Sequence, residues 1–549
     1  MSLHPRRINP VPFTTSQIAQ AAFPKGNLYL TMRDEIGTLY SDCDFETLFP
    51  TDGQPAVCPW QLALICVMQF IEGLSDRQAS EAVRSRIDWK YALGLELTDP
   101  GFNFTVLSEF RTRLLSGGAE HQLLELLLKQ FKERGWLKDR GKQRTDSTHV
   151  LAAIRTLNRL EGNGEVLRAA LNAIATVAPD WLRSWVPPEW FERYNRAFDE
   201  YHLPKGIPAR TKFAEIIGND GMQLLTILWE TSGVAYLRQI PAVEILRLTW
   251  IHQYYVENDS LRLRAATDLP PTGTRMDSPY DKDARYGNKR SVTWIGYKVH
   301  ITETCDADEV HLITNVDTTQ AHISDVDQTE PIHQSLAAQK LLPKEHIVDA
   351  GYVDANLLVT SQKQYGVIVV GPARPNVSWQ SKTPGGYDIS QFKVNWNTKR
   401  VTCPMSKKST KKWTPSQDQW GNQVIRVGFP RRTCQLCPSR SLCTRSATEP
   451  RRLTLRPKKE HESLQSLRIQ QETASWQEIY NARAGVEGTI SQAVRAFGLR
   501  KARYAGLAKV HLQHIISAVA INVVRVVSWL QGVPHAQTRT SRFAALAIT

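Results

Sequence analysis

The sequence lacks any long uninterrupted apolar run. None of its 549 residues fall in a stretch of about 18 uncharged apolar positions, the length needed to cross a bilayer. The best candidate, residues 515–530, is interrupted by Asn522 and Arg525 and predicts a buried helix. Residues 1–12 are polar and lack the apolar centre of a signal peptide. We therefore expect a cytoplasmic protein with no membrane partner and with reduced cysteines.

Acidic residues are too few to balance the basic ones. The 54 Asp and Glu against 68 Lys and Arg leave a formal net charge of +14. This favours a polyanionic partner, with nucleic acid ahead of an anionic membrane. Between residues 399 and 460 we count 16 Lys and Arg against three acids, a surplus of 13, so the rest of the chain is nearly neutral. Such a run can be a solvated face, but its concentration favours a phosphate-contacting segment. Four of its members, the insert lysines, are candidate DNA contacts: Lys407, Lys408, Lys411 and Lys412.

The length predicts about three or four structural units. Residues 1–140 have the apolar spacing of several short helices, and Ser75 is a candidate N-cap for a helix from Asp76. Short helices joined by turns would suit a helix-turn-helix reader of DNA, although a plain helical bundle without DNA contact fits them too. The pattern predicts a helical N-terminal domain.

The rest of the chain predicts a mixed α/β arrangement. Residues 141–371 combine β-branched strands with a strand–helix–strand unit, which favours a mixed sheet covered by helices, and a helical insertion interrupts them at about 158–259. Within this part, residues 324–340 and 354–365 predict helices, and residues 366–371 predict a buried strand. Residues 372–480 form a basic, β-rich insertion that contains cysteines, and residues 481–549 are a helical C-terminal part. The fold class is therefore multidomain α/β.

Three acids stand in settings where chemistry is plausible. Asp146 lies inside a strand-like run, Asp349 ends the apolar strand of residues 346–348, and Glu487 lies on a predicted helix that also carries Arg483 and Tyr480 on one face. Taken alone, Asp349 could be a turn former or helix cap. Glu487 and Arg483 could likewise be an ordinary surface pair one turn apart.

Together, three carboxylates are the hard oxygen ligands that two Mg²⁺ (or Mn²⁺) ions need. Two such ions about 3.5–4 Å apart can activate a nucleophile and stabilise the leaving oxygen of a phosphodiester. Magnesium binds a few carboxylates and keeps several waters. The sequence therefore predicts that Asp146, Asp349 and Glu487 are both the catalytic residues and the metal ligands.

Three long motifs carry a family resemblance. "RTDSTHV", "VDAGYVDANLL" and "YNARAGVEGTISQAVRAFGLRKARYAGLAKVHLQHIISAVAINVVRV" resemble the catalytic blocks of bacterial insertion-sequence transposases of the DDE class, and "GLSDRQASEAVRSRIDWKYALG" resembles their N-terminal domain. The resemblance runs from about residue 40 to 530. It implies a ribonuclease-H-like catalytic core, with Asp146, Asp349 and Glu487 as the three acids.

The resemblance also implies the Tyr-Arg-Glu-Lys signature branch. Tyr480, Arg483 and Glu487 fit that signature, but Val494 stands where lysine is expected. The usual lysine–phosphate contact is therefore in doubt. Its candidate replacements are the nearby basic residues Arg495, Arg500 and Lys501.

Four cysteines cluster inside the basic insertion. The insert cysteines are Cys403, Cys434, Cys437 and Cys443. A Cys-x-x-Cys pair with two further cysteines can form a tetrahedral Zn²⁺ site, but the wide spacing leaves free thiols and a disulfide open.

Aromatic residues and one histidine give weaker signals. Tryptophans interleave with the basic residues of the insertion and could stack on unpaired bases or pack a small core. His149 could touch the site, although a core histidine fits it as well.

The sequence thus predicts a DNA transposase of an insertion sequence. It would bind terminal inverted repeats and target DNA, act as a homodimer assembled on double-stranded DNA, and cleave and transfer strands in the bacterial cytoplasm at the nucleoid. Two alternatives stay open: a ribonuclease-H-like nuclease without strand transfer, and a non-catalytic DNA-binding protein. All three acids are present, which argues against the second.

Overall fold

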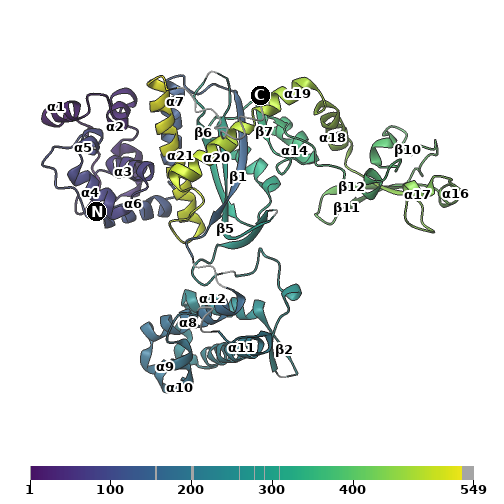
Figure 1. Ribbon diagram of the computed structural model, residues 1–549, viewed down its shortest axis with the longest axis horizontal. Helices are drawn as coiled ribbons and strands as arrows, with labels where there is room; N and C mark the ends of the chain where they lie inside the picture. The colour runs from purple at the N-terminus through teal and green to yellow at the C-terminus, as the bar shows by residue number, and fades with distance from the viewer. Residues whose placement is uncertain are drawn as a thin grey trace, which may run out of the picture.

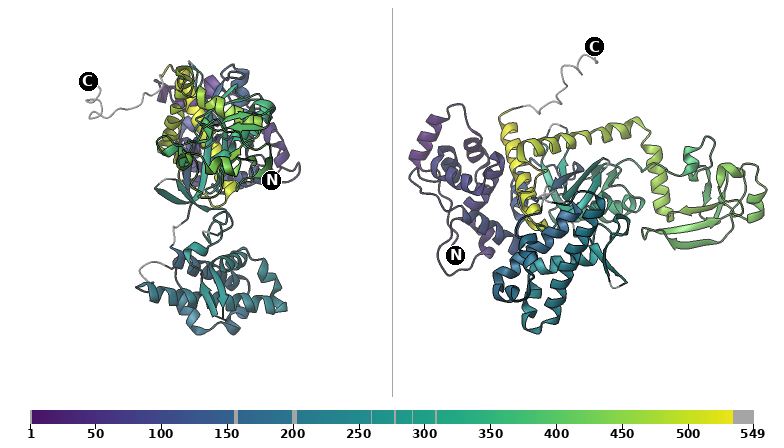
Figure 2. Two further views of the ribbon diagram at one scale, coloured as in Figure 1. Left: turned by 90° about the vertical axis from the view of Figure 1, so that its right-hand side faces the viewer. Right: turned by 60° about the horizontal axis from the view of Figure 1, so that its bottom comes forward.

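A central sheet carries three attached parts, as Figure 1 shows. The N-terminal helices lie on one side of the sheet, the basic insertion extends from the opposite side, and the helical insertion stands off below. Figure 2 shows the same helical insertion separated from the sheet by extended connections. This computed structural model describes residues 2–154, 158–198, 203–258, 260–276, 278–289, 291–307 and 309–533, so residues 534–549 of the expected C-terminal part lie outside the described residues.

The N-terminal part is helical, as predicted. Helix α3 (Pro59–Glu72) begins with proline in its first turn and ends at Gly73, whose φ is +69°. The expected cap of α4 (Asp76–Ser85) is confirmed, because Ser75 accepts from the Gln78 amide and Gln78 accepts in return from the Ser75 amide. The other α-helices of this part are α1 (Phe13–Ala22), α2 (Leu28–Thr31), α5 (Ile87–Leu93), α6 (Thr105–Ser116) and α7 (Gln122–Glu133).

The sheet is mixed, as the strand pattern predicts. Strand β1 (Lys142–Leu151) lies at its centre, antiparallel to β5 (Val292–Thr304) on one side and parallel to β7 (Glu345–Val348) on the other. The remaining strands are β4 (Arg285–Lys289) and β6 (Ile313–Gln320), both paired with β5, and β8 (Ile368–Val370), parallel to β7. Asp146 therefore lies on the central strand, and Asp349 follows a neighbouring parallel strand.

Helix α21 (Leu507–Leu530) joins the N-terminal helices to the sheet. It packs against α3, α7 and β6, and the three parts share one continuous hydrophobic core. It is the one helix among the described residues long and apolar enough to span a membrane, with a mean hydropathy of 1.5, and 83% of that window is buried inside the protein. The predicted buried helix at 515–530 is thus confirmed as the C-terminal two thirds of α21.

The helical insertion has a hydrophobic core of its own, built from residues between Val166 and Leu261. Its longest helix, α11 (Ile207–Glu230), packs against α8 (Arg159–Val177). The other elements are α9 (Pro179–Trp185), α10 (Pro188–Tyr194), α12 (Pro241–Gln253), β2 (Tyr254–Glu257) and β3 (Ser260–Leu263). A separate core explains how this segment can interrupt the sheet between two of its strands.

Two expected elements next to the sheet are interrupted. The helix predicted at 324–340 starts with a 3-10 turn at Asp325–Gln328 and becomes α-helical only in α13 (Thr329–Ala338). The helix predicted at 354–365 is α14 (Ala355–Thr360) continued by one π-turn, Ser361–Tyr365. The strand expected to be buried around residue 368 is only partly so, since Ile368 is 44% exposed at its start.

The basic insertion is less purely β than predicted. It has short strands over a small core, but helix α18 (Lys458–Gln470) also falls within it, before the point at which helices were expected to resume. The strands are β9 (Lys393–Asn395), β10 (Arg400–Thr402), β11 (Trp413–Gln417), β12 (Gln423–Gly428) and β13 (Arg452–Leu455), and the short helices are α15 (Trp379–Lys382), α16 (Arg431–Gln435) and α17 (Arg440–Cys443).

Candidate active site

One arginine joins two of the three predicted acids. The Arg483 guanidinium donates to Asp146 Oδ2 at 2.9 Å and to Glu487 Oε1 at 3.1 Å. Asp146 and Arg483 are 337 residues apart in the chain and come from the central strand and from the start of α20 (Ala484–Phe497). Glu487 and Arg483 do form the pair one turn apart that the surface-pair alternative expects, but Arg483 is only 18% exposed and also holds Asp146.

Asp349 lies at the carboxyl end of β7, next to the central strand. Its Oδ1 accepts from the Gly351 amide at 2.7 Å, so the predicted turn-forming contact is present. A side chain at Gly351 would place its Cβ 2.8 Å from that oxygen, so glycine leaves room for the carboxylate to fold back. Among the described residues, Asp349 Oδ2 has no hydrogen-bond partner and stays available for a ligand.

A fourth acid lies beside these three. Asp325 Oδ2 accepts from Ser147 Oγ at 3.3 Å, and its Oδ1 accepts from Lys298 Nζ at 2.9 Å. It faces Asp349 across Gly351, whose Cβ position would be 3.4 Å from Asp325 Oδ2. Sequence reasoning missed Asp325, because it lies in a turn with several polar neighbours and no strand end marks it.

Burial makes the charge of these carboxyl groups sensitive to their partners. Burial raises the pKa of Asp146 above its usual value, and the Arg483 guanidinium offsets part of this effect. Burial also opposes ionisation of Asp325, but the Lys298 ammonium outweighs it and the pKa of Asp325 lies below its usual value. Nearby cations therefore favour the negatively charged form of these carboxyl groups, whereas burial opposes it.

The helix that carries Glu487 is not continuous with Tyr480, and here the sequence prediction was wrong. The predicted single helix is divided into α19 (Ala474–Asn481) and α20, with Ala482 and Arg483 between them. The Arg144 guanidinium donates to the Ala482 carbonyl at 2.6 Å, and a side chain at Gly485 would overlap that guanidinium. The Arg144 guanidinium thus binds the backbone at the interruption between α19 and α20.

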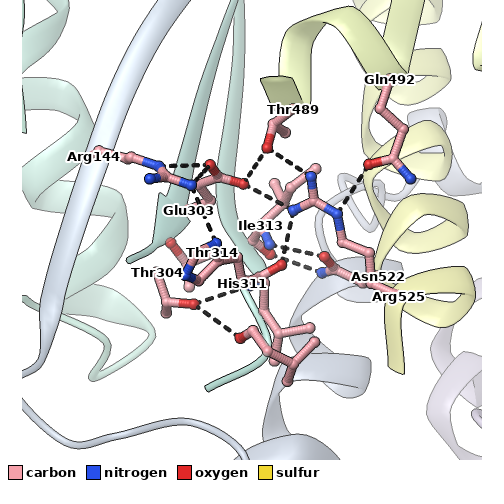
Figure 3. Close-up of polar contacts among 12 residues, drawn as sticks. Arg144, Glu303, Thr304, His311, Ile313, Thr314, Thr489, Gln492, Asn522 and Arg525 are labelled. Carbon is pink, nitrogen blue, oxygen red and sulfur yellow. Dashed lines mark hydrogen bonds and ion pairs between the residues drawn. The ribbon is translucent and has the colours of Figure 1, made fainter. Parts of the chain in front are cut away.

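A buried carboxylate anchors this arginine, as Figure 3 shows. Glu303 on β5 is fully buried and accepts from Arg144 Nε at 2.7 Å, from Arg525 Nη1 at 2.8 Å and from Thr489 Oγ1 at 2.6 Å. Burial alone would raise its pKa, but Arg525 and Arg144 outweigh burial and hold the pKa of Glu303 below its usual value. Since Thr489 belongs to α20 and Arg525 to α21, Glu303 ties both helices to the sheet.

The predicted basic replacements lie at different distances from the centre. Arg500 Nε donates to Thr148 Oγ1 at 2.9 Å, two residues along β1 from Asp146. Arg495 and Lys501 are exposed, and Lys501 lies where the backbone pairs with Leu151 at the end of β1. Of the three, Arg500 is the one with a side-chain contact to the strand that carries Asp146.

Two aromatic groups flank the same region. Tyr480 stacks on Trp476 with ring centroids 4.7 Å apart. His149 is half-buried and lies against the Trp294 ring at 5.5 Å, with burial lowering its pKa. Its contact with an aromatic ring agrees with the core-histidine alternative.

The insert cysteines lie around one small cavity of about 30 Å³. All four are free thiols, so the disulfide alternative is not present. The Lys407 amide donates to Cys403 Sγ at 3.3 Å, and burial raises the pKa of Cys443 to about 11, with the other three thiols acting in the same direction. The fold thus gathers sulfurs from the segment after β10, from α16 and the residues that follow it, and from the end of α17.

The insert lysines and tryptophans differ in exposure. All four insert lysines are exposed and have no carboxylate partner among the described residues. Trp396 and Trp413 pack edge to face at 5.1 Å in the small core, and Trp379 lies under the Arg445 guanidinium. Trp420 is 76% exposed, so it is the predicted stacking residue that remains open to a ligand.

Neither the acidic centre nor the group of insert cysteines, as described in this structure, has the spacing that a metal ion requires. Within the part of the chain that the structure describes, no group of three His, Cys, Asp or Glu side chains is arranged to hold a metal ion. At the acidic centre, the Arg483 guanidinium lies between two of the carboxylates. The donor types suit magnesium at the acids and zinc at the thiols.

Two family models match the chain. A Transposase DDE domain matches residues 402–527, and a Transposase domain (DUF772) matches residues 17–113. Together they support an insertion-sequence transposase. The first match contains the insert cysteines and Glu487, whereas Asp146 and Asp349 lie outside both. No curated protein and no solved structure matches the chain.

These matches bear on the broad predictions. They support a transposase, an enzyme whose partner is DNA, and the mixed α/β sheet is consistent with such a catalytic core. The family matches do not assign roles to single residues.

Proposed function

We propose that the protein is a DDE transposase that cleaves and rejoins DNA at the ends of an insertion sequence, with Asp146, Asp349 and Glu487 as its catalytic acids. The observation that carries this proposal is the Arg483 guanidinium, which holds Asp146 and Glu487 together from opposite ends of the chain. Asp349 follows the strand paired with β1, so the third acid lies on the same side of the sheet.

The sheet supports a ribonuclease-H-like core. It is antiparallel on one side of β1 and parallel on the other, and helices α20 and α21 cover it. In sheets of this kind, sites form at the carboxyl ends of parallel strands, where Asp349 stands. Tyr480, Arg483 and Glu487 support membership of the Tyr-Arg-Glu-Lys branch. Arg500 would make the phosphate contact of the missing lysine.

Two divalent cations fit the donor chemistry of this centre. Asp146, Asp349 and Glu487 would hold them, and bound Mg²⁺ or Mn²⁺ would activate the attacking oxygen and stabilise the leaving one. Among the described residues, Asp349 Oδ2 has no hydrogen-bond partner, and Glu487 is 65% exposed. Arg483, released from Asp146, would then be free to contact a phosphate.

The chain's own residues do the positioning. Glu303 and Arg144 fix the start of α20, so that Arg483 and Glu487 meet the strand that carries Asp146. Lys298 keeps Asp325 ionised beside Asp349. The N-terminal helices would bind the terminal inverted repeats, the insert lysines would hold flanking or target DNA, and two copies would pair the two ends.

The insert cysteines are proposed to bind one structural zinc. Four thiols around one cavity are a common zinc donor set. The small core of the insertion has few apolar residues, and a metal would supply stability that such a core lacks.

The assignment of the acids is tested by changing Asp349 to Asn. The variant should lose cleavage of a duplex carrying the element's own end while binding that duplex as tightly as the wild type, because Asn retains the size of the side chain and not its charge. Asp180→Asn is the matched control. Asp180 is 93% exposed on the helical insertion, so the protein with this substitution should cleave normally. Normal cleavage by the Asp349 variant would refute the assignment.

Transposase and simple nuclease are separated by a joining assay. Pre-cut element ends are incubated with Mg²⁺ and a supercoiled target, and covalently joined products are resolved on a gel. A transposase joins the ends to the target, whereas a nuclease only nicks it. Nicked target without joined product would favour the nuclease alternative.

A further inference from the structure

A second site lies beside the acidic centre. A groove of about 450 Å³ runs between the β4–β5 hairpin and the turn that follows Asp349, and Gly351 forms part of its wall. This volume is within the range of about 300–1,000 Å³ that is usual for ligand sites. Because the Gly351 amide also binds Asp349, the groove opens next to a predicted catalytic acid.

The groove carries a net positive charge. Three cations, Lys289, Lys298 and Arg374, line it together with one carboxylate, Asp325, which leaves a surplus of two. Lys298 is the cation that Asp325 neutralises, at 2.9 Å. Lys289 and Arg374 have no carboxylate partner among the described residues and are both exposed.

The two unneutralised cations are fixed near the acids. The Arg374 guanidinium donates to the carbonyl oxygens of Ala350 and Gly351, at 3.2 and 3.0 Å, so it lies over the turn after Asp349. Lys289 ends β4, which pairs with the same long strand as the central β1. Its ammonium is close enough to act on the carboxyl groups of both Asp146 and Asp325, where it works toward a lower pKa.

We infer that this groove binds backbone phosphates of the DNA strand next to the scissile phosphodiester, with Lys289 and Arg374 as the phosphate-binding cations. Unneutralised cations that flank a cluster of four acids would offset the repulsion between those acids and the polyanionic strand. The inference rests on the proposed function, since it names where the substrate of that site lies.

The test measures DNA binding without metal, so that cleavage does not enter. A fluorescent duplex carrying the element's own end is titrated in EDTA at several salt concentrations. In the double variant Lys289→Ala/Arg374→Ala, the slope of log affinity against log salt should become shallower by up to about 1.8, or about 0.9 for each lost phosphate contact. The matched control is Lys212→Ala/Arg196→Ala, which removes two exposed charges from the helical insertion and should leave the slope unchanged. An unchanged slope in the groove variant, or an equal change in the control, overturns the inference.

A charge-preserving variant separates charge from structure. Lys289→Arg/Arg374→Lys should keep a slope close to that of the wild type. If its salt slope becomes as shallow as that of the alanine variant, the effect is structural and the inference is overturned.

The position of the contact is tested on the DNA. Single methylphosphonates, which are uncharged, replace the phosphates one at a time on both sides of the cleavage position. At one or two positions next to that bond, a methylphosphonate should weaken DNA binding by the wild type. At the same positions, it should not weaken DNA binding by the alanine variant any further. Equal losses in both proteins would place the contact elsewhere. Since Asp349→Asn tests cleavage and this series tests binding, either proposal can fail while the other survives.

Discussion

Neutralising Glu303 should destabilise the core of the protein more than any exposed charge change. The side chain is fully buried and accepts from two guanidinium groups and one hydroxyl, all within 2.8 Å. Glu303→Gln keeps the shape but removes the charge that compensates Arg144 and Arg525. Breaking a buried pair in this way costs about 3–5 kcal/mol, because an uncompensated charge stays in the interior.

The expected effect is large relative to the stability of a typical folded domain, about 5–15 kcal/mol. The measurement is urea unfolding of the full chain, followed by amide hydrogen exchange in β5 and α20 so that the core is separated from the helical insertion. The control is Glu244→Gln on α12, whose pair with Arg247 at 2.7 Å is 45% and 37% exposed and should contribute no more than about 1 kcal/mol. A loss below about 1 kcal/mol for Glu303→Gln would contradict the claim that the buried network anchors α20.

The same carboxylate predicts a pH dependence. Its pKa in the folded protein lies below the value in the unfolded chain, so its contribution is complete above the unfolded pKa, about 4.3. The contribution is lost as the pH falls from there through the folded pKa. Wild-type stability should therefore fall in acid more steeply than that of Glu303→Gln, and parallel curves below about pH 4 would count against the depressed pKa.

Three further outcomes are expected in the basic insertion. Protein purified without chelator should contain about one equivalent of zinc and lose it in Cys437→Ser, and less than about half an equivalent in the wild type would refute the site. Changing all four insert lysines to Gln should reduce the salt slope of DNA binding by up to about 0.9 per lost contact, whereas an unchanged slope would mean a solvated face. Trp396→Ala should destabilise the insertion by about 0.5–3 kcal/mol, because its ring is half-buried against Trp413. Trp420→Ala should change stability by no more than about 0.5 kcal/mol and weaken binding to single-stranded DNA, and unaltered binding would exclude stacking at this ring.

Local patterns were enough to predict many of the elements. The Ser75 cap and α3 follow from residues within a few positions of each other, and each is confirmed. The strand that carries Asp146 follows from its β-branched residues, and the buried helix near residue 515 follows from an apolar run of the right length. These features depend on backbone geometry and on which side chains can be buried, and both are visible in short windows of sequence.

The candidate site was predictable only in part. The motifs named Asp146, Asp349 and Glu487 as candidates, and their metal-binding role remains a prediction. They gave no sign of Asp325 and Lys298, because a turn residue paired with a strand residue 27 positions away has no local pattern. Glu303 was likewise missed, since its partners come from three distant segments.

By itself, the sequence determined the kinds of elements, the positive surplus and the acids available for chemistry. Tertiary packing decided how they meet. Arg144 binds the backbone between the two helices into which the expected long helix is divided, and α21 joins the N-terminal helices and the sheet in one core. Both outcomes arise from contacts between residues hundreds of positions apart, whose free energy depends on which buried charges find partners in the folded chain.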